Sequence, residues 1–129
     1  FFMLTGDLHN SFAINVTPNV WEFASGPANS INHVPANDEG QRPANGTFKY
    51  GPRECDIRWS AYVHADTPRL ERQQPTYCVV QVNNVFNSPL QRGDERWVAY
   101  PHPQVIFKYF DAFTGELRYS ESIVIGMKN

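Results

Sequence analysis

The feature that most constrains this chain is the alternation of apolar and polar side chains with a period of two. In Phe12–Thr17 the large apolar residues occupy every second position. Successive side chains of a β-strand point to opposite faces, so this period predicts a strand with one buried face. Aromatic residues form 14% of the chain and cluster with Val, Ile and Thr, a combination that favours strands. No segment gives a convincing helical pattern, and we expect a mostly β fold with antiparallel strands.

Several segments are predicted as strands. They cover residues 1–4, 12–17, 20–24, 57–63, 76–82, 104–110 and 117–125, and a short strand is expected around Val98, before Pro101. Phe1–Leu4 is continuously apolar, which predicts a strand buried on both faces. Pro18-Asn19 predicts a hairpin between the second and third strands, and Gly115, which tolerates a positive φ, predicts another between the last two. A single helical turn is expected at Pro68–Arg72.

The chain is interpreted as one partial domain in three parts. Its 129 residues suit a single domain. Residues 1–27 hold the first strand and the hairpin that follows it, residues 28–57 form a long loop rich in Pro, Asn and Gly, and residues 58–129 hold the closing strands. A loop of this length inside a compact domain is expected to be a functional insertion or an extended arm with partners of its own.

Charge and hydropathy exclude several partner classes. The formal net charge is -2 and the sequence pI is about 6.1, so no basic field attracts nucleic acid or anionic lipid. No apolar run approaches the ~20 residues of a membrane-spanning helix. Cys55 and Cys78 match no zinc spacing, and two interpretations stay open: two buried thiols, or a disulfide, which requires an oxidising compartment. The sequons at Asn15 and Asn45 are compatible with export, and an extracellular, periplasmic or cell-surface location is expected.

The residues that carry chemistry follow the first apolar strand directly. In the run Thr-Gly-Asp-Leu-His-Asn at 5–10, Asp7 and His9 lie two positions apart, after a glycine that lets the backbone turn sharply. Carboxylate oxygen and imidazole nitrogen are good ligands for iron, zinc and manganese, and a strand end holds such ligands rigidly. The spacing alone is a weak signal, because an Asp and a His in a polar turn are more often simply solvated.

The context of this run adds a family resemblance. The segment Phe1–Ala13, a buried strand followed by Thr-Gly-Asp-x-His, resembles the last conserved block of PhoD-like metallophosphoesterases, a branch of the calcineurin-like superfamily. Val20–Pro27 and the hairpin at Tyr109–Tyr119 are similar to later strands of the same family. The resemblance implies that Asp7 and His9 are metal ligands at the catalytic centre. The wider superfamily usually has Gly-His-x-His here, so Asp7 hardens the ligand set towards oxygen.

The resemblance also implies what the chain does and what it lacks. It implies a hydrolase, a phosphatase or phosphodiesterase, in which two metal ions, iron and calcium, clamp a phosphate ester. Asn10 and His33 are further candidates for the site. The superfamily's other ligand motifs do not precede Asp7 in order, and the chain begins without Met. We therefore expect the C-terminal half of an α/β sandwich, inactive without the missing N-terminal part of the domain or a second chain.

A second class of function stays open, a non-catalytic β module derived from such a domain that binds partners or self-associates. It accounts for the short chain, the aromatic strands and the Pro/Asn/Gly arm. A half-sheet leaves unpaired backbone groups at its inner edge, and another copy can pair with them. Four arginines are candidates for a basic lip around a phosphate, although such side chains more often form surface ion pairs: Arg53, Arg58, Arg69 and Arg72.

Overall fold

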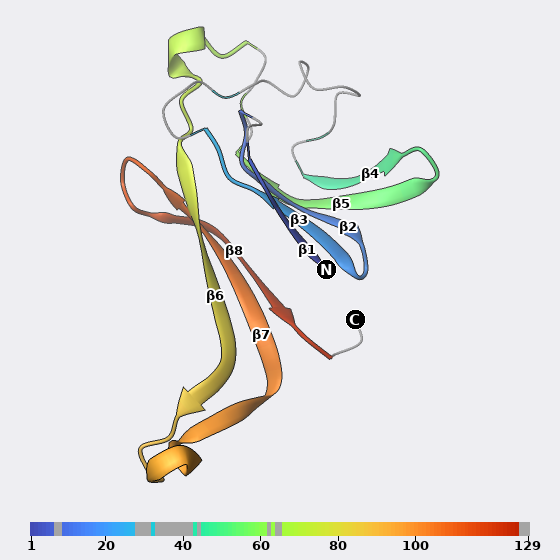
Figure 1. Ribbon diagram of the computed structural model, residues 1–129. Coiled ribbons are helices and arrows are strands. Elements are labelled where there is room, and N and C mark those ends of the chain that lie inside the picture. Colours follow the sequence, from blue (N-terminus) through green and yellow to red (C-terminus); the bar gives the residue numbers. More distant parts are fainter. Residues whose placement is uncertain are drawn as a thin grey trace.

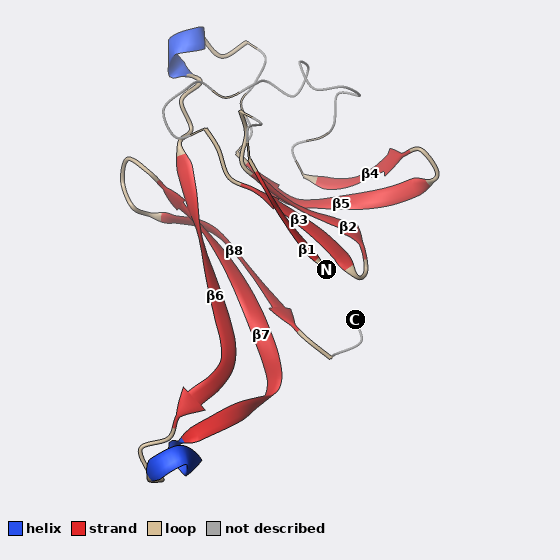
Figure 2. Cartoon of the chain, viewed as in Figure 1, coloured by secondary structure: helices blue, strands red, loops and turns tan. Residues whose placement is uncertain are grey.

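The structure, a computed structural model, describes residues 1–6, 9–27, 32, 43, 45–61, 63 and 66–126. Two β-sheets pack against each other and make up most of it, which confirms the expected mostly β fold (Figures 1 and 2). Helical structure in the described ranges consists of short 3-10 turns at Arg69–Glu71, as expected, and at Gly93–Arg96. None of the helices described there is long and apolar enough to cross a membrane.

The strands form a five-stranded and a three-stranded sheet. They are β1 (Phe2–Thr5), β2 (Phe12–Thr17), β3 (Val20–Ala24), β4 (Gly46–Tyr50), β5 (Arg53–Ser60), β6 (Thr76–Asn87), β7 (Trp97–Asp111) and β8 (Leu117–Val124). The five-stranded sheet has the order β1-β3-β2-β5-β4, and the three-stranded sheet has the order β6-β7-β8. All paired neighbours are antiparallel except β1 and β3, which run parallel. Both predicted hairpins, β2–β3 and β7–β8, are confirmed.

Aromatic side chains fill the space between the two sheets. Phe23 of β3 stacks on Phe107 of β7 with ring centroids 3.5 Å apart. Trp59 of β5 lies against Tyr109 and Tyr119, at centroid distances of 4.9 and 5.5 Å. Each such ring buries a large apolar area, so this inter-sheet core is the main contact that holds the sheets together.

Tyr109 adds a directional bond to this packing. Its hydroxyl is fully buried and donates to the carbonyl oxygens of Phe12, at 3.0 Å, and Ala24, at 2.9 Å. Burial, with a smaller contribution from the Cys78 thiol, raises the pKa of Tyr109. The phenol therefore stays protonated and continues to donate across the sheet interface.

The opposite face of the five-stranded sheet carries a second apolar cluster. Its buried members are Phe12, Ile14, Ala24, Cys55 and Ile57. Cys78 packs instead against the inter-sheet core, so the two thiols belong to clusters on different faces of the sheet. Both cysteines are free, which favours the two-thiol interpretation over the disulfide.

The prediction that Phe1–Leu4 is buried on both faces is wrong. Strand β1 lies at the edge of its sheet and pairs with β3, and Leu4 is 67% exposed. A continuous apolar run is typical of a strand with neighbours on every side. In the described residues, β1 has a strand partner on one edge and an uncovered side chain on its inner face.

The predicted loop at 28–57 is too long, because β4 and most of β5 lie within this range. The two strands form an antiparallel hairpin in which Gly46 and Gly51 adopt positive φ values of 90° and 61°. Strand β5 then ends at Ser60, before the predicted end at residue 63. Lys, Glu, Asp and Arg alternate with Phe48, Cys55 and Ile57 here, and this high polarity hid the period-two signal.

Strand β7 joins the short strand predicted around Val98 to the strand predicted at 104–110, and it passes through two prolines. Register between β6 and β7 breaks between Asn83 and Val85, which pair with Gln104 and Ala99. Pro101 and Pro103 fall within the resulting bulge, where a missing N–H removes no regular ladder bond. The prolines therefore interrupt the pairing without ending the strand.

We expect Tyr109→Phe to lower the free energy of unfolding by about 1–3 kcal/mol, because two buried carbonyls lose their donor while the ring remains. Urea unfolding followed by tryptophan fluorescence measures the loss. Tyr77→Phe is the matched control, because Tyr77 is 46% exposed and stacks on Phe110 through its ring. Equal stabilities for the two variants would show that the Tyr109 hydroxyl contributes nothing to holding the sheets together.

The turn between β7 and β8 depends on Asp111. Its carboxylate accepts hydrogen bonds from the backbone amides of Phe113, at 2.8 Å, and Thr114, at 3.0 Å. The amides of Thr114 and Phe113 favour the charged carboxylate and lower the pKa of Asp111. A lowered folded-state pKa contributes stability that is complete above the unfolded value and is lost as the pH falls through the folded value.

We therefore expect the NMR titration of Asp111 to have a midpoint below the ordinary value of about 3.9. In Asp111→Asn the stability should depend less steeply on pH over the interval below that value, because the amide does not titrate. A midpoint at or above the ordinary value would contradict the turn geometry.

Candidate functional site

Several strand ends meet at one end of the five-stranded sheet, beside the start of β6 (Figure 1). Thr5 at the end of β1 pairs with Ala24 at the end of β3, and Phe12 at the start of β2 pairs with both Ala24 and Ser60. The junction between β1 and β2, which holds the predicted metal-binding motif, therefore lies at this end. The two ends of this junction are held in place because β1 and β2 belong to the same sheet.

The structure describes part of the predicted motif. Asp7 and His33 lie outside the described residues. His9 is half-buried at a bend and interacts with a neighbouring group of the chain. Asn10 is 4% exposed and follows it directly, so these two candidates are brought together at the strand junction. Within the described ranges no group of three or more His, Cys, Asp or Glu side chains is placed to hold a metal.

The hydrogen bonding of the buried Asn10 side chain is incomplete in the described part of the chain. Its carbonyl oxygen, Oδ1, is buried and has no hydrogen-bond partner among the described residues. A buried acceptor without a donor costs about 1–3 kcal/mol. Such an atom is satisfied by an N–H or O–H group, or by a cation that accepts oxygen ligands. Among the described residues, nothing supplies such a group to Asn10 Oδ1.

The next residue, Ser11, is buried and hydrogen-bonded to the ends of several strands. Its fully buried hydroxyl donates to the carbonyl of Gly26, at 2.8 Å, and accepts from the Gly26 amide, at 3.0 Å. It also forms a short hydrogen bond with the hydroxyl of Thr76, at the start of β6. The Ser11 carbonyl accepts from the amide of Ala61, just beyond β5. Ser11 thus ties β2 to the ends of β3, β5 and β6.

A second buried and hydrogen-bonded polar residue is Asn32, which is 1% exposed. Its backbone amide donates to the Arg72 carbonyl at 2.7 Å, and its side-chain carbonyl accepts from the amide of Gln74 at 3.1 Å. Its side-chain amide reaches the Ala61 carbonyl at 3.5 Å. Asn32 therefore connects the backbone at Ala61 to the backbone at Arg72 and Gln74, and Ala61 is also bonded to Ser11. These bonds favour one arrangement of the backbone beside the motif, as a rigid binding site requires.

The sequence did not reveal Ser11, Asn32 or Thr76 as structural supports of the site. Ser11 and Thr76 are 65 positions apart, and no local pattern joins them. The one local signal for Ser11 is its position directly after Asn10 at the start of an apolar strand.

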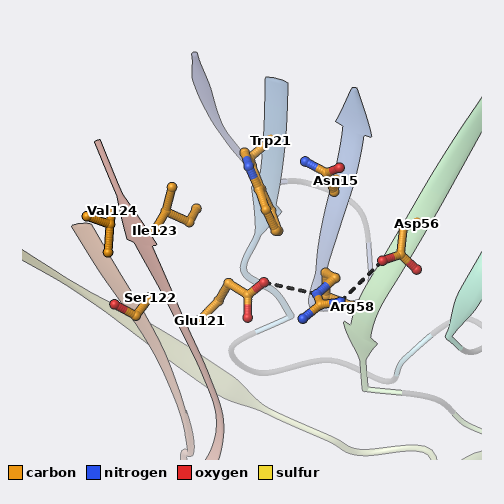
Figure 3. A pocket seen from close by; sticks show the side chains of 8 residues that line it. All are labelled: Asn15, Trp21, Asp56, Arg58, Glu121, Ser122, Ile123 and Val124. Atoms are coloured by element: carbon orange, nitrogen blue, oxygen red, sulfur yellow. Dashed lines mark hydrogen bonds and ion pairs between the residues drawn. The ribbon is translucent and has the colours of Figure 1, made fainter. Parts of the chain in front are cut away.

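A separate pocket of about 420 Å³ opens between the two sheets (Figure 3). It is lined by Asn15, Trp21, Asp56, Arg58, Glu121, Ser122, Ile123 and Val124. Arg58 lies between two carboxylates, with Nε 3.0 Å from Glu121 and a terminal nitrogen 3.3 Å from Asp56. The Glu121 charge is the main reason that the pKa of Arg58 is raised. These pairs already balance the Arg58 charge, so the suggested role in a basic lip for phosphate does not fit Arg58.

No protein-family model, curated protein or solved structure matches this chain.

We expect Ser11→Ala to lower the free energy of unfolding by about 1–3 kcal/mol, because the Thr76 hydroxyl and the Gly26 amide lose their buried partner. Chemical denaturation measures the change. Ser120→Ala on β8 is the control, because Ser120 is exposed, and it should stay within about 0.5 kcal/mol of the parent. Similar values for both variants would rule out Ser11 as a tie between the strands.

Proposed function

We propose that this chain is the C-terminal part of a metal-dependent phosphoesterase domain that hydrolyses phosphomonoesters or phosphodiesters at a binuclear metal centre. The observation that carries the proposal is the buried side-chain carbonyl of Asn10, which directly follows His9 in the chain and lacks a hydrogen-bond partner among the described residues. This is where the Gly-Asp-x-His motif of PhoD-like enzymes would deliver metal ligands. In this proposal Asp7 and His9 are the ligands from this side of the site.

The chain's own residues would have distinct tasks. His9 offers an imidazole nitrogen, and Asp7 offers carboxylate oxygens, which together suit iron in one position and calcium in another. Asn10 offers a neutral oxygen, either to a metal or to the proton of a bound phosphate ester. When bound, a metal pair orients the phosphate and lowers the pKa of a coordinated water. The hydrogen bonds of Ser11 and Asn32 would hold the backbone of the junction in place when the charged ligands come together.

Two features of β1 agree with a role as one strand of a larger enzyme sheet. It is parallel to β3, whereas every other pair is antiparallel, and parallel strands are typical of α/β domains. Ligand sites in such sheets lie outside the carboxyl ends of the strands, and His9 follows the carboxyl end of β1. The remaining ligands would come from other parts of the domain or from a second chain.

A non-catalytic assembly module is the second candidate. The observation that favours it is the apolar far end of the β6–β7 ribbon, which extends beyond the five-stranded sheet (Figure 1). Val85, Phe86 and Trp97 are 51%, 41% and 57% exposed there. Exposed apolar clusters of this kind are typical of surfaces that bind another protein.

The test uses the polypeptide encoded by the complete reading frame, after its intact mass has been measured. We expect it to hydrolyse p-nitrophenyl phosphate or bis-p-nitrophenyl phosphate, and to lose this activity when a chelator removes the metals. His9→Ala should lower kcat/KM by at least about 100-fold. Removing a residue that only hydrogen-bonds to a metal ligand costs up to about 100-fold, and removing the ligand itself should cost at least as much. It should also reduce the bound metal measured by elemental analysis.

His102→Ala is the matched control, because His102 is exposed on β7 in the other sheet. It should retain both activity and metal. Equal activity and metal content for the two histidine variants would contradict the phosphoesterase proposal. An inactive parent polypeptide that sediments as a concentration-dependent oligomer would support the assembly module instead.

A further inference from the structure

The space between the two sheets changes from apolar to polar along the strands. Ala13 and Phe107 belong to the inter-sheet core. Asn15 lies two positions after Ala13 on β2, and Glu121 of β8 is the register partner of Phe107. Register partners, and side chains two positions apart on one strand, point to the same face of a sheet. Polar side chains therefore occupy positions where the strand period predicts apolar core residues.

A β-bulge lies at this polar end of the core. Ala13 of β2 pairs with Trp59 of β5, whereas the next residue, Ile14, pairs with Ile57. Arg58 is therefore the extra residue, without a register partner on β2. Bulges re-aim side chains and are frequent beside active sites, so the position of Arg58 is a feature to be explained by function.

The ion pair of Arg58 with Glu121 joins the two sheets at this end (Figure 3). The Glu121 side chain is 14% exposed, whereas that of Arg58 is 47% exposed. Removing a carboxylate from water costs free energy that a single ion pair does not reliably repay, so such a pair is weak evidence for stability. Charged groups buried beside a cavity are instead candidates for ligand recognition.

The pocket of about 420 Å³ beside these charges also has an aromatic wall. Trp21 of β3, the register partner of Asn15, lines it. An adjoining cavity of about 240 Å³ shares Trp21 with this pocket and is lined mainly by apolar residues, among them Phe2 and Pro18. The pocket falls within the range of about 300–1,000 Å³ that is typical of small-molecule sites. The indole therefore borders both polar and apolar space.

The mixture of charges distinguishes between classes of ligand. A simple anion would meet the carboxylates of Asp56 and Glu121, and a simple cation would meet the guanidinium of Arg58. A neutral sugar avoids both conflicts, because each of its hydroxyl groups donates to a carboxylate and accepts from an N–H group. The flat, apolar C–H face of a sugar ring also suits the face of an indole, whose π-system is negative.

We propose that this pocket binds a neutral sugar unit, with the ring against Trp21 and the hydroxyl groups on Asp56, Arg58 and Glu121. The site lies towards the opposite ends of β2 and β3 from the β1–β2 junction, because Trp21 is near the start of β3 and Ala24 is at its end. The inference is therefore independent of the proposed phosphoesterase activity.

The experiment follows the indole N–H signals of the three tryptophans in two-dimensional ¹⁵N NMR spectra of the 129-residue chain. The probes are the methyl glycosides of glucose, galactose, mannose and N-acetylglucosamine, each added up to its solubility limit. We expect at least one of them to shift the Trp21 signal saturably at millimolar concentration. Trp97 is an internal control, because it is 57% exposed on the other sheet and its signal should stay in place.

Glu121→Gln tests the role of the charged groups, with Glu116→Gln as the matched control in the exposed β7–β8 turn. We expect Glu121→Gln to weaken binding by about 10-fold or more, because a hydrogen bond to a charged acceptor is stronger than one to a neutral acceptor. Glu116→Gln should bind as the parent does. If Glu121→Gln does not fold, Asp56→Asn replaces it, because the Asp56 side chain is 34% exposed and carries less of the packing.

Four outcomes would overturn the inference. The first is that none of the glycosides shifts the Trp21 signal. The second is a shift of the Trp97 signal alone, which would indicate adhesion to an exposed aromatic ring. The third is equal affinity of the Glu121 and Glu116 variants, or of the Asp56 variant and the parent. The fourth is that tetramethylammonium or inorganic phosphate shifts the Trp21 signal whereas the glycosides do not, which would assign the pocket to an ion.

Discussion

The contact between Tyr109 and the strand ends Phe12 and Ala24 sets the relation between the two sheets. The phenol ring packs in the inter-sheet core, and the hydroxyl donates to carbonyls of β2 and β3. Both carbonyls lie next to the junction that carries His9 and Asn10, because Phe12 opens β2 and Ala24 closes β3. A shift between the sheets would therefore move the ends of the strands that frame the candidate site. The packing of the core and the geometry of the site are consequences of the same contact.

Among the described polar side chains around the junction, three are buried and hydrogen-bonded, and Asn10 has a carbonyl oxygen without a partner. Ser11, Asn32 and Thr76 are buried and hydrogen-bonded to strand ends or neighbouring backbone. A fully connected buried network of this kind favours one arrangement of the chain over its alternatives. The side-chain carbonyl of Asn10 stands out against this background, because it is buried and lacks a partner among the described residues.

Local pattern predicted the bounds of β2 and β3 and the turn at Gly115, from period two and from turn chemistry. The expectation that β2 has one buried face is wrong, because Phe12 and Ile14 pack in one cluster while Ala13 packs in the inter-sheet core on the other face. The exposure of β1 did not follow, because an apolar run has the same sequence whether or not its neighbours are in place. The hairpin of β4 and β5 was hidden by its charged residues, and the length of β7 was hidden by two prolines that lie in a bulge. At the site, the motif was legible from residues 5–10, whereas the Ser11–Thr76 bond joins residues too distant for any local signal.

The free edge of β1 and the candidate metal site are linked by the direction of one strand. The strand leads to His9 at its carboxyl end, and among the described strands it pairs with β3 alone. Parallel strands present their carboxyl ends at the same edge of a sheet, and ligand sites form where those ends meet.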